Sequence, residues 1–174
     1  MQANLEKTTI ALPDAELLLA DLAASMRPHI RPGCALVGIH TGGVWLAQRL
    51  QRALDIAEAP GSLDVTFYRD DFGSIGLHPR AKRTHIPFEV EGRDIVLVDD
   101  VLYTGRTIRA AMNELFDYGR PASIRLAVLI DRQQRELPIG AQFCGATLDV
   151  PQDQILVLEN TPQDKLTLKL ESRR

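Results

Sequence analysis

The stretch from Ile95 to Thr107, IVLVDDVLYTGRT, constrains this chain more than any other part of it. Its first four residues are apolar and mostly β-branched, which is typical of a short buried strand. Two carboxylates, Asp99 and Asp100, follow directly. The loop Tyr103–Thr107 comes next and leads into a helical pattern of apolar residues that begins at Ile108. We therefore predict a strand, an acidic pair, a loop and the N-terminus of a helix, in that order.

The two halves of this stretch suit two parts of one ligand. A helix N-terminus presents unpaired N–H groups and a partial positive charge, which favour a phosphate. Gly105 allows close approach of the backbone and a positive φ, and Thr104 and Thr107 add hydroxyl donors. The carboxylates of Asp99 and Asp100 repel a phosphate, but they suit sugar hydroxyls and a positively charged sugar carbon. A ribose 5-phosphate needs both halves.

Two other interpretations of the stretch differ in strength. An ordinary strand–turn–helix with a Thr- and Gly-containing turn remains an alternative. The common nucleotide-binding motifs are excluded, because the chain has neither GxxxxGK[ST] nor GxGxxG after a strand.

A second segment repeats the same order of elements. Cys34–Ile39 is predicted as a buried strand, the turn His40–Gly43 (the HTGG loop) follows it, and a helical pattern begins at Val44. The carboxyl ends of neighbouring parallel strands face one crevice. We therefore expect the two loops to lie together, although a plain turn with a structural His40 remains an alternative.

The remaining elements are predicted from periodicity and turn residues. A helix opens at Pro13 and Asp14, runs to about Met26 and packs on the core. The helix behind the central motif is predicted to end with Gly119 as its C-cap. The other predicted strands are Leu63–Tyr68, His85–Val90, Ile124–Ile130, Phe143–Leu148, Ile155–Glu159 and an edge strand over Lys165–Leu170, with a turn at Glu91–Gly92.

The segment Phe72–Arg83 has no periodicity and contains two glycines, a proline and three basic residues. Long connections of this kind in compact domains are often lids. A lid that excludes water suits chemistry at a reactive sugar carbon. We expect Arg80, Lys82 or Arg83 to approach the ligand from this segment.

Length, charge and cysteine use limit the class of protein. A chain of 174 residues is predicted to form a single domain, residues 1–174. Its formal net charge of -3 argues against broad attraction to nucleic acid but permits a local basic patch. Cys34 and Cys144, far apart and without a CxxC motif, are predicted to be reduced, buried side chains of a cytoplasmic protein. No signal peptide and no apolar run long enough for a bilayer is present, so we predict no membrane association.

The stretch Ile95–Thr107 closely resembles the 5-phosphoribosyl-1-pyrophosphate (PRPP) signature of the type I phosphoribosyltransferases. The similarity extends over roughly Leu36 to Gly145. It follows the order seen in the family of bifunctional pyrimidine-operon regulatory proteins/uracil phosphoribosyltransferases. The further matching stretches are LVGIHTGGVWLAQRL, FYRDD, IPFEV, DYGRPASI and RELPIGAQFCG.

The resemblance implies an α/β fold, with a parallel sheet flanked by helices, a small hood and a flexible active-site loop. It implies conversion of uracil and PRPP to UMP and pyrophosphate, and a homodimer or a higher homo-oligomer. Mg²⁺ is implied as a cofactor that PRPP carries near Asp99 and Asp100, because a hard dication neutralises clustered phosphate oxygens.

The resemblance also assigns roles to residues. Asp99 and Asp100 are the implied catalytic residues, which hold the sugar diol and favour the developing positive charge. The implied ligands of the 5-phosphate are Tyr103, Thr104, Gly105, Arg106 and Thr107. Those of the pyrophosphate are His40, Thr41, Gly42, Gly43, Arg69 and Arg80, and those of uracil are Asp131, Arg132, Arg135, Glu136, Leu137 and Pro138.

The chain departs from the family at two places. The family often has Lys-Thr-Arg-Gly where this chain has His40–Gly43, so contacts to pyrophosphate would depend more on Thr41 and backbone N–H groups. Gram-positive relatives bind a pyrimidine-biosynthesis mRNA leader through a basic dimer face, partly on the first helix. The first helix here has no Lys or Arg before Arg27, and phosphate contact needs cations. The candidates for another basic patch are Arg49, Arg52, Arg106 and Arg109.

Three functions therefore compete. The first is a uracil phosphoribosyltransferase, which the intact acidic pair favours. The second is a regulator that senses a nucleotide in the same pocket and binds RNA, with weak or no catalysis. The third is a phosphoribosyltransferase for a purine base, against which the sequence Asp131–Pro138 argues.

Overall fold

The computed structural model describes residues 10–65 and 84–173 of the chain. The helices are α1 (Ala15–Met26), the short 3₁₀ helix η1 (Arg27–His29), α2 (Gly42–Ala53) and α3 (Arg106–Phe116). The strands are β1 (Ala35–Ile39), β2 (Gly61–Leu63), β3 (Asp94–Leu102), β4 (Ser123–Asp131), β5 (Phe143–Thr147), β6 (Gln154–Asn160) and β7 (Leu166–Ser172). No helix within the described ranges is long and apolar enough to cross a membrane.

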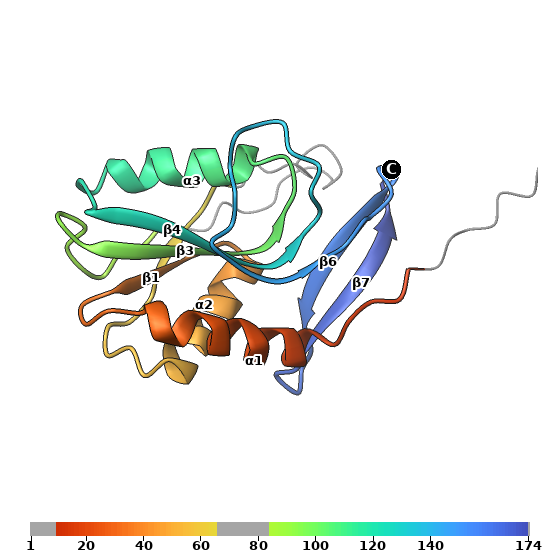
Figure 1. Cartoon of the computed structure of the whole chain (residues 1–174), viewed down its shortest axis with the longest axis horizontal. Helices are drawn as coiled ribbons and strands as arrows, with labels where there is room; N and C mark the ends of the chain where they lie inside the picture. Colours follow the sequence, from red (N-terminus) through yellow and green to blue (C-terminus); the bar gives the residue numbers. More distant parts are fainter. Residues whose placement is uncertain (1–9, 66–83, 174) are drawn as a thin grey trace, which may run out of the picture.

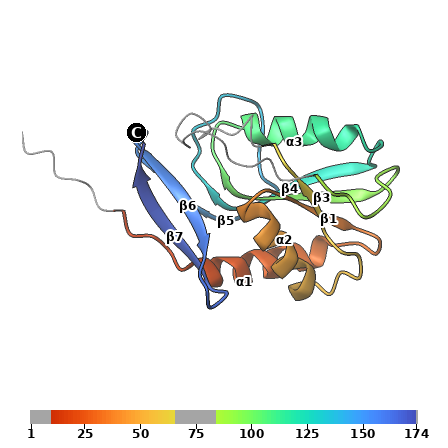
Figure 2. The same ribbon diagram turned by 180° about the vertical axis from the view of Figure 1, so that it is seen from behind.

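Five strands form one parallel sheet in the order β2-β1-β3-β4-β5. Helix α3 covers one face of the sheet, and α1 and α2 cover the other (Figure 1). Strands β6 and β7 pair antiparallel in a separate hairpin at the side of the molecule (Figure 2). The predicted α/β class with a parallel sheet flanked by helices is therefore confirmed.

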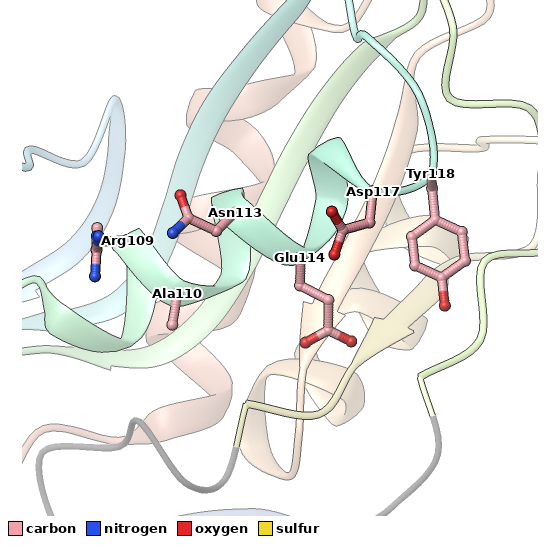
Figure 3. Close-up of a pocket in the computed structure, with 6 residues that line it drawn as sticks. All are labelled: Arg109, Ala110, Asn113, Glu114, Asp117 and Tyr118. Atoms are coloured by element: carbon pink, nitrogen blue, oxygen red, sulfur yellow. The ribbon is translucent and has the colours of Figure 1, made fainter.

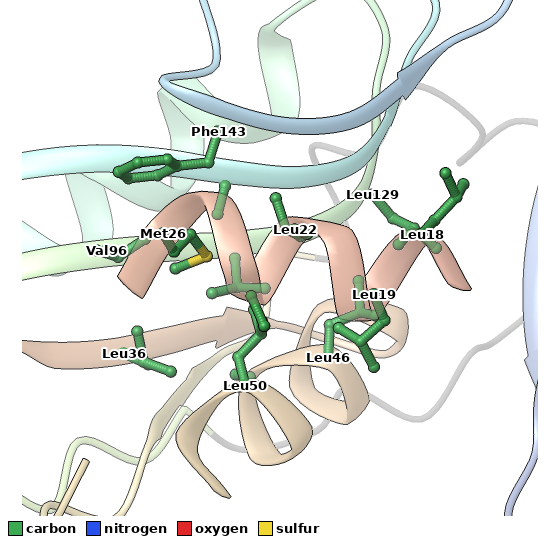
Figure 4. Packing of buried hydrophobic residues seen from close by; sticks show 14 of the residues in the cluster. Leu18, Leu19, Leu22, Met26, Leu36, Leu46, Leu50, Val96, Leu129 and Phe143 are labelled. Carbon is green, nitrogen blue, oxygen red and sulfur yellow. The ribbon is translucent and has the colours of Figure 1, made fainter. Parts of the chain in front are cut away.

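Two hydrophobic clusters, one on each face, explain the uniformly apolar strands. Val96 and Val98 of β3 face α1 and α2, whereas Ile95 and Leu97 face α3. Because both faces are covered, β1 is buried at all five positions. On the first face, Leu19 of α1 meets α2 side chains such as Leu46 and Leu50, and Leu22 and Met26 of α1 lie against the sheet (Figure 4).

The local sequence explains where α1 begins. Asp14 is its N-cap, and its carboxylate accepts hydrogen bonds from the N–H groups of Glu16 and Leu17 at 2.8 and 3.1 Å. The prediction of a helix from Pro13 and Asp14 to about Met26 is thus confirmed. Strands β1, β4, β5 and β6 also lie where the sequence predicted them, to within one residue at either end.

The hairpin is fastened to the helices by one arginine. Arg49 of α2 donates to the Glu16 carboxylate at 2.7 Å and to the Asp164 carboxylate at 2.9 Å. The N–H of Leu166 donates to the same Glu16 carboxylate at 2.6 Å. A hydrogen bond from Asn160, together with the charge of Arg49, lowers the pKa of Asp164. The turn of the hairpin is therefore held against α1 and α2.

Two predicted strands are wrong within the described residues. The strand predicted over Leu63–Tyr68 is instead β2, Gly61–Leu63, which ends where the prediction began; residues 66–68 lie outside the described ranges. Residues His85–Val90 form a single bridge, His85 with Ser62, instead of a strand. Pro87 has no N–H to donate and so interrupts further pairing.

Two smaller expectations need correction, and a third is confirmed. Helix α3 ends at Phe116 with Asp117 as its C-cap, so Gly119, at φ +144°, lies beyond the cap. The edge strand predicted over Lys165–Leu170 is β7, which runs to Ser172 and pairs on one side only, with β6. Both cysteines are free, as predicted, but only Cys34 is buried and Cys144 is exposed.

Candidate active site

The site lies where the strand order reverses. The chain leaves β1 through α2 toward β2, and it leaves β3 through α3 toward β4, on the opposite side. Helices α2 and α3 therefore start from the carboxyl ends of neighbouring strands and lie on opposite faces of the sheet (Figure 1). This is the position at which open α/β sheets bind ligands.

The acidic pair, Asp99 and Asp100, lies at this reversal and is buried. The sequence placed the pair just after the strand, but β3 extends to Leu102 because its pairing with β4 continues through Asp99 and Val101. The Asp99 carboxylate accepts a hydrogen bond from the N–H of Asp100, and the Asp100 carboxylate accepts one from the N–H of Val101, both at 2.9 Å. Each carboxylate is thus oriented by the backbone of its own strand.

The distribution of buried polar side chains also indicates a site around Asp99 and Asp100. Within residues 10–65 and 84–173, the buried polar or charged side chains are those of Asp99, Asp100, Thr104, Thr107 and Arg132. All five belong to the predicted site. Burying polar groups costs free energy unless they are paired, so their concentration here indicates a site.

The HTGG loop packs directly on the acidic pair. A Cβ atom added to Gly42 would lie 2.4 Å from the Asp100 carboxylate, and one added to Gly43 would lie 2.3 Å from the Val98 carbonyl oxygen. Only glycine permits such an approach at these two positions. His40, whose N–H donates to the Leu63 carbonyl at 2.9 Å, is joined to Thr41 by a cis peptide bond. The HTGG loop therefore lies against the end of β3 that carries Asp99 and Asp100.

Both helices begin in a form that suits anions. Helix α2 has Thr41 as its N-cap and α3 has Gly105, and the N–H of Arg106, the first residue of α3, donates to the Thr104 hydroxyl at 3.2 Å. Neither first turn contains an acidic residue. Gly105 has φ +94°, which glycine adopts at low cost. The two N-termini therefore offer N–H groups and partial positive charge at the rim of the site.

The loop Tyr103–Thr107, for which a 5-phosphate was predicted (the 5-phosphate loop below), is joined to residues 131–138 (the hood loop). The carbonyl of Thr104 accepts hydrogen bonds from the N–H groups of Glu136 and Leu137, at 2.9 and 3.1 Å. The side chain of Arg106 forms an exposed ion pair with Glu136 at 2.7 Å. The loops that the sequence assigned to the 5-phosphate and to uracil are thus in contact.

Two arginines of the hood loop have well-defined partners. Arg135 donates to the Asp131 carboxylate at 2.5 Å and to the carbonyls of Tyr103 and Ile139 at 2.8 Å. Arg132 is buried, and its guanidinium lies 4.0 Å from the centre of the Tyr103 ring. Pro138 follows Leu137 on the same loop.

Two further groups of predicted residues have different outcomes. Arg69 and Arg80, with the rest of the predicted lid as far as Arg83, lie outside the described residues. The basic patch proposed from Arg49, Arg52, Arg106 and Arg109 is wrong as one surface, because α2 and α3 lie on opposite faces of the sheet (Figure 1). Arg49 and Arg106 are, in addition, paired with carboxylates.

A groove of about 600 Å³ lies along α3, and Figure 3 shows the side chains that line it. Its lining is Arg109, Ala110, Asn113, Glu114, Asp117 and Tyr118. None of these residues was predicted to bind PRPP or uracil. The volume would accommodate a small molecule, but the groove contains neither the acidic pair nor a helix N-terminus.

Comparison with known proteins agrees with this geometry. The family model described as the phosphoribosyl transferase domain matches residues 9–153. Proteins named Bifunctional protein PyrR are similar over most of the chain. That of Pseudomonas aeruginosa is 51% identical over 151 residues, which cover 83% of this chain and 88% of the relative. That of Pseudomonas savastanoi pv. phaseolicola is 46% identical over 166 residues, covering 93% and 96%.

The chain belongs to the PyrR family of phosphoribosyltransferases. Solved structures support the fold of this PyrR-family chain. A hypoxanthine phosphoribosyltransferase from Staphylococcus aureus has a TM-score of 0.64 at 21% identity and covers 90% of this chain and 86% of its own. A hypoxanthine-guanine phosphoribosyltransferase from Bacillus anthracis has a TM-score of 0.64 at 16% identity, with coverage of 81% and 85%. At these identities the likeness concerns the fold alone.

Two adjacent carboxylates of this PyrR-family chain could hold a metal ion. No cluster of three or more His, Cys, Asp or Glu side chains suited to a metal occurs in the described part of the chain. Asp99 and Asp100 provide adjacent carboxylates, the hard oxygen ligands that Mg²⁺ prefers. Because Mg²⁺ usually takes most of its ligands from phosphates and water, two carboxylates suit a metal–substrate complex better than a permanent metal site.

Sequence reasoning missed one residue beside the site of this PyrR-family chain. Arg173, just after β7, places its guanidinium 5.6 Å from the centre of the Tyr103 ring. No local pattern around Arg173 indicates this contact, because it depends on how the β6–β7 hairpin packs. The sequence also gave no sign that Leu137 and Ile139 crowd Gly105, where an added Cβ would lie 3.1 Å from Ile139.

Proposed function

We propose that this chain is a uracil phosphoribosyltransferase that converts uracil and PRPP to UMP and pyrophosphate. The observation that carries the proposal is the buried acidic pair, which lies beside the N-termini of α2 and α3 at the reversal of the strand order. In this arrangement the carboxylates can bind a sugar diol, and the two helix N-termini can bind one anionic group of the ligand on either side of it. The 51% identity to proteins named Bifunctional protein PyrR supports the same assignment.

Each loop has one task in this proposal. Tyr103, Thr104, Gly105, Arg106 and Thr107 hold the 5-phosphate at the N-terminus of α3. His40, Thr41, Gly42 and Gly43, at the N-terminus of α2, hold the leaving pyrophosphate, together with Arg69 and Arg80. The hood loop contacts the edge of uracil through Asp131, Arg135, Glu136, Leu137 and Pro138.

The chemistry requires positioning and electrostatics more than a nucleophile on the protein. The bond between C1 of the ribose and the pyrophosphate oxygen breaks, with its electron pair going to pyrophosphate. A bond from N1 of uracil to C1 forms, and the N1 proton is released. Positive charge develops on the sugar in between, and the carboxylates of Asp99 and Asp100 stabilise it in a buried site where electrostatic effects are strong.

Mg²⁺ is the proposed cofactor, carried by PRPP near Asp99 and Asp100. When bound, it neutralises phosphate oxygens and so favours departure of pyrophosphate. The two carboxylates orient the sugar hydroxyls, and the HTGG loop keeps its backbone close to them.

The experiment that tests the proposal measures UMP formation from uracil and PRPP, with and without Mg²⁺. Hypoxanthine and orotate serve as control bases. Magnesium-dependent formation of UMP from uracil alone is the expected result. Turnover of hypoxanthine in place of uracil would refute the choice of base, and that control matters because the similar solved structures named above are hypoxanthine enzymes.

A second candidate function is regulation of pyrimidine-biosynthesis genes through an mRNA leader. The word bifunctional in the relatives' name favours it. Against it, α1 contains no Lys or Arg, so this helix offers no cation to RNA phosphates. Titration of a leader RNA, with and without UMP, tests the proposal.

A homodimer or a higher homo-oligomer in the cytoplasm is the proposed working state.

A further inference from the structure

The first residue of the 5-phosphate loop, Tyr103, is held from three directions. Its carbonyl accepts a hydrogen bond from Arg135 at 2.8 Å. Its ring lies against the guanidinium of Arg132, 4.0 Å from the ring centre, and against that of Arg173 at 5.6 Å. Arginine over an aromatic face attracts it through the charge distribution of the ring.

Arg132 also fastens a segment that is distant in sequence. Its guanidinium donates to the carbonyls of Val150, Pro151 and Gln154, at 3.0 to 3.2 Å. Its own N–H donates to the Leu102 carbonyl at 2.9 Å, just before Tyr103. One buried side chain therefore connects the end of β3 with the connection that leads into β6.

Arg173 reaches the same segment from the other strand of the hairpin. Its N–H donates to the Asp153 carbonyl at 2.7 Å, while its side chain extends to Tyr103. The end of β7 lies on the same side of the molecule as the loops that follow β3 and β4 (Figure 2). Residues 150–154 and Tyr103 are thus both held by the same two arginines.

We propose that Arg132 and Arg173 are positioning residues, which hold Tyr103 and through it the 5-phosphate loop in the conformation that binds phosphate. The β6–β7 hairpin then has a role in substrate binding through Arg173, although it does not supply a ligand to the substrate. This inference rests on the proposed role of the 5-phosphate loop. It also reassigns Arg132, because a guanidinium that is stacked on Tyr103 and bonded to three carbonyls is badly placed to read a uracil edge.

The two roles of Arg132 differ in which ligand they affect. Ribose 5-phosphate contains the phosphate that the loop would bind, but it has no pyrophosphate and no base. Pyrophosphate alone probes the HTGG loop. If Arg132 positions Tyr103, its loss raises the Kd of ribose 5-phosphate. The Kd of pyrophosphate and the KM for uracil then stay unchanged. If Arg132 contacts the base, its loss raises the KM for uracil and leaves the Kd of ribose 5-phosphate unchanged.

The experiment is calorimetric titration of the full-length protein with ribose 5-phosphate and, separately, with magnesium pyrophosphate. Because Arg132 is buried, the primary variants are at the partly exposed Tyr103 and Arg173. We expect Tyr103→Leu to raise the Kd of ribose 5-phosphate about tenfold, since it removes the ring from both guanidinium groups. Tyr103→Phe keeps the ring and should stay within about twofold of the wild type. Arg173→Gln should raise the Kd about threefold, because its contact is longer.

Arg52→Gln, at an exposed position of α2, is the matched control and should leave both dissociation constants unchanged. Arg132→Gln combined with Tyr103→Leu should bind ribose 5-phosphate no more weakly than Tyr103→Leu alone, because the contact of Arg132 with the Tyr103 ring is already lost in Tyr103→Leu. If Tyr103→Leu weakened the binding of ribose 5-phosphate and of pyrophosphate equally, Tyr103 would have a general structural role, and this result would overturn the proposal. So would a Tyr103→Leu variant that binds ribose 5-phosphate like the wild type, or a wild type that does not bind it.

The outcome is independent of the proposed uracil activity. Wild-type protein that makes no UMP, with the predicted pattern of dissociation constants, would refute the uracil reaction and support the positioning role. Wild-type protein that makes UMP, with a Tyr103→Leu variant of unchanged affinity for ribose 5-phosphate, would support the reaction and refute the positioning role.

Discussion

Replacing Gly42 by alanine tests whether the HTGG loop and the acidic pair form one unit. The added Cβ would lie 2.4 Å from an Asp100 carboxylate oxygen, and contacts of this kind are not shorter than about 3.0 Å in real structures. The carboxylate must therefore retreat by at least about 0.6 Å. Rotation of the carboxylate alone does not relieve the contact, because the Cβ of Asp100 itself is 2.9 Å away. Helix α2 or the side chain of Asp100 has to move.

The expected cost has two parts. Overpacking of a tight contact lowers the free energy of unfolding by about 1–3 kcal/mol. Displacement of a catalytic carboxylate by a distance approaching 1 Å lowers kcat/KM by up to about 100-fold. Urea unfolding measures the first part, and UMP formation measures the second. Gly140→Ala is the control, because no atom lies within 4 Å of its added Cβ.

Two results would refute this reasoning. A Gly42→Ala protein with wild-type stability and turnover would show that the loop and Asp100 are not in contact in solution. A Gly140→Ala protein as impaired as Gly42→Ala would show that any glycine near the site has the same effect. Gly43→Ala adds a check on the stability part, since its Cβ would meet the Val98 carbonyl oxygen at 2.3 Å, and a backbone atom is harder to displace than a side chain.

Three further outcomes are expected. Asp99→Asn with Asp100→Asn should lower UMP formation by at least about 100-fold, because the groups that stabilise positive charge are lost, while circular dichroism stays native; undiminished turnover would contradict their role. Leu22→Ala, in the core between α1 and the sheet, should lower the free energy of unfolding in urea by about 2–5 kcal/mol without changing the m-value, and a change below 1 kcal/mol would show that the site collapses. The pKa of Asp164 is lowered by Asn160, so its contribution to stability is present above its unfolded pKa of about 3.9 and is lost as the pH falls through the folded value; Asp164→Asn should flatten stability against pH in this acidic range and leave the profile above about pH 5 parallel to that of the wild type.

The central motif was predictable because its signals are local. An apolar, β-branched run and a glycine before a helical pattern define a strand, a turn and a helix from their own residues. The buried side chain of Thr104 lies in the loop that this order of elements predicts, whereas Asp99 and Asp100 lie inside β3 and not after it. Gly42 and Gly43 were predicted as loop residues, but they form the start of α2. The reason for glycine there is the nearby Asp100 and Val98, which only the folded structure shows.

The remainder depends on contacts between distant segments. Strand β3 extends past the acidic pair because β4 pairs with it as far as Leu102. No local sequence pattern near Asp99 predicts that pairing. The alternation in His85–Val90 is typical of a strand, yet only His85 pairs, through a bridge with Ser62. Arg132 has a sequence context typical of a ligand-binding loop, but its side chain points to carbonyls near β6. Tertiary packing overrides local preference in all three cases.

The register of β1 beside β3 has a consequence for refolding. These strands are hydrogen-bonded neighbours, although residues 40–93 separate them along the chain. The HTGG loop and the loop Tyr103–Thr107 follow their carboxyl ends. Helices form in microseconds or less, whereas parallel pairing of distant segments must first overcome the entropy of closing a long loop. After dilution from denaturant, helical circular dichroism should therefore return before any affinity for PRPP. The time at which ligand binding returns therefore measures when β1 and β3 pair at the centre of the sheet.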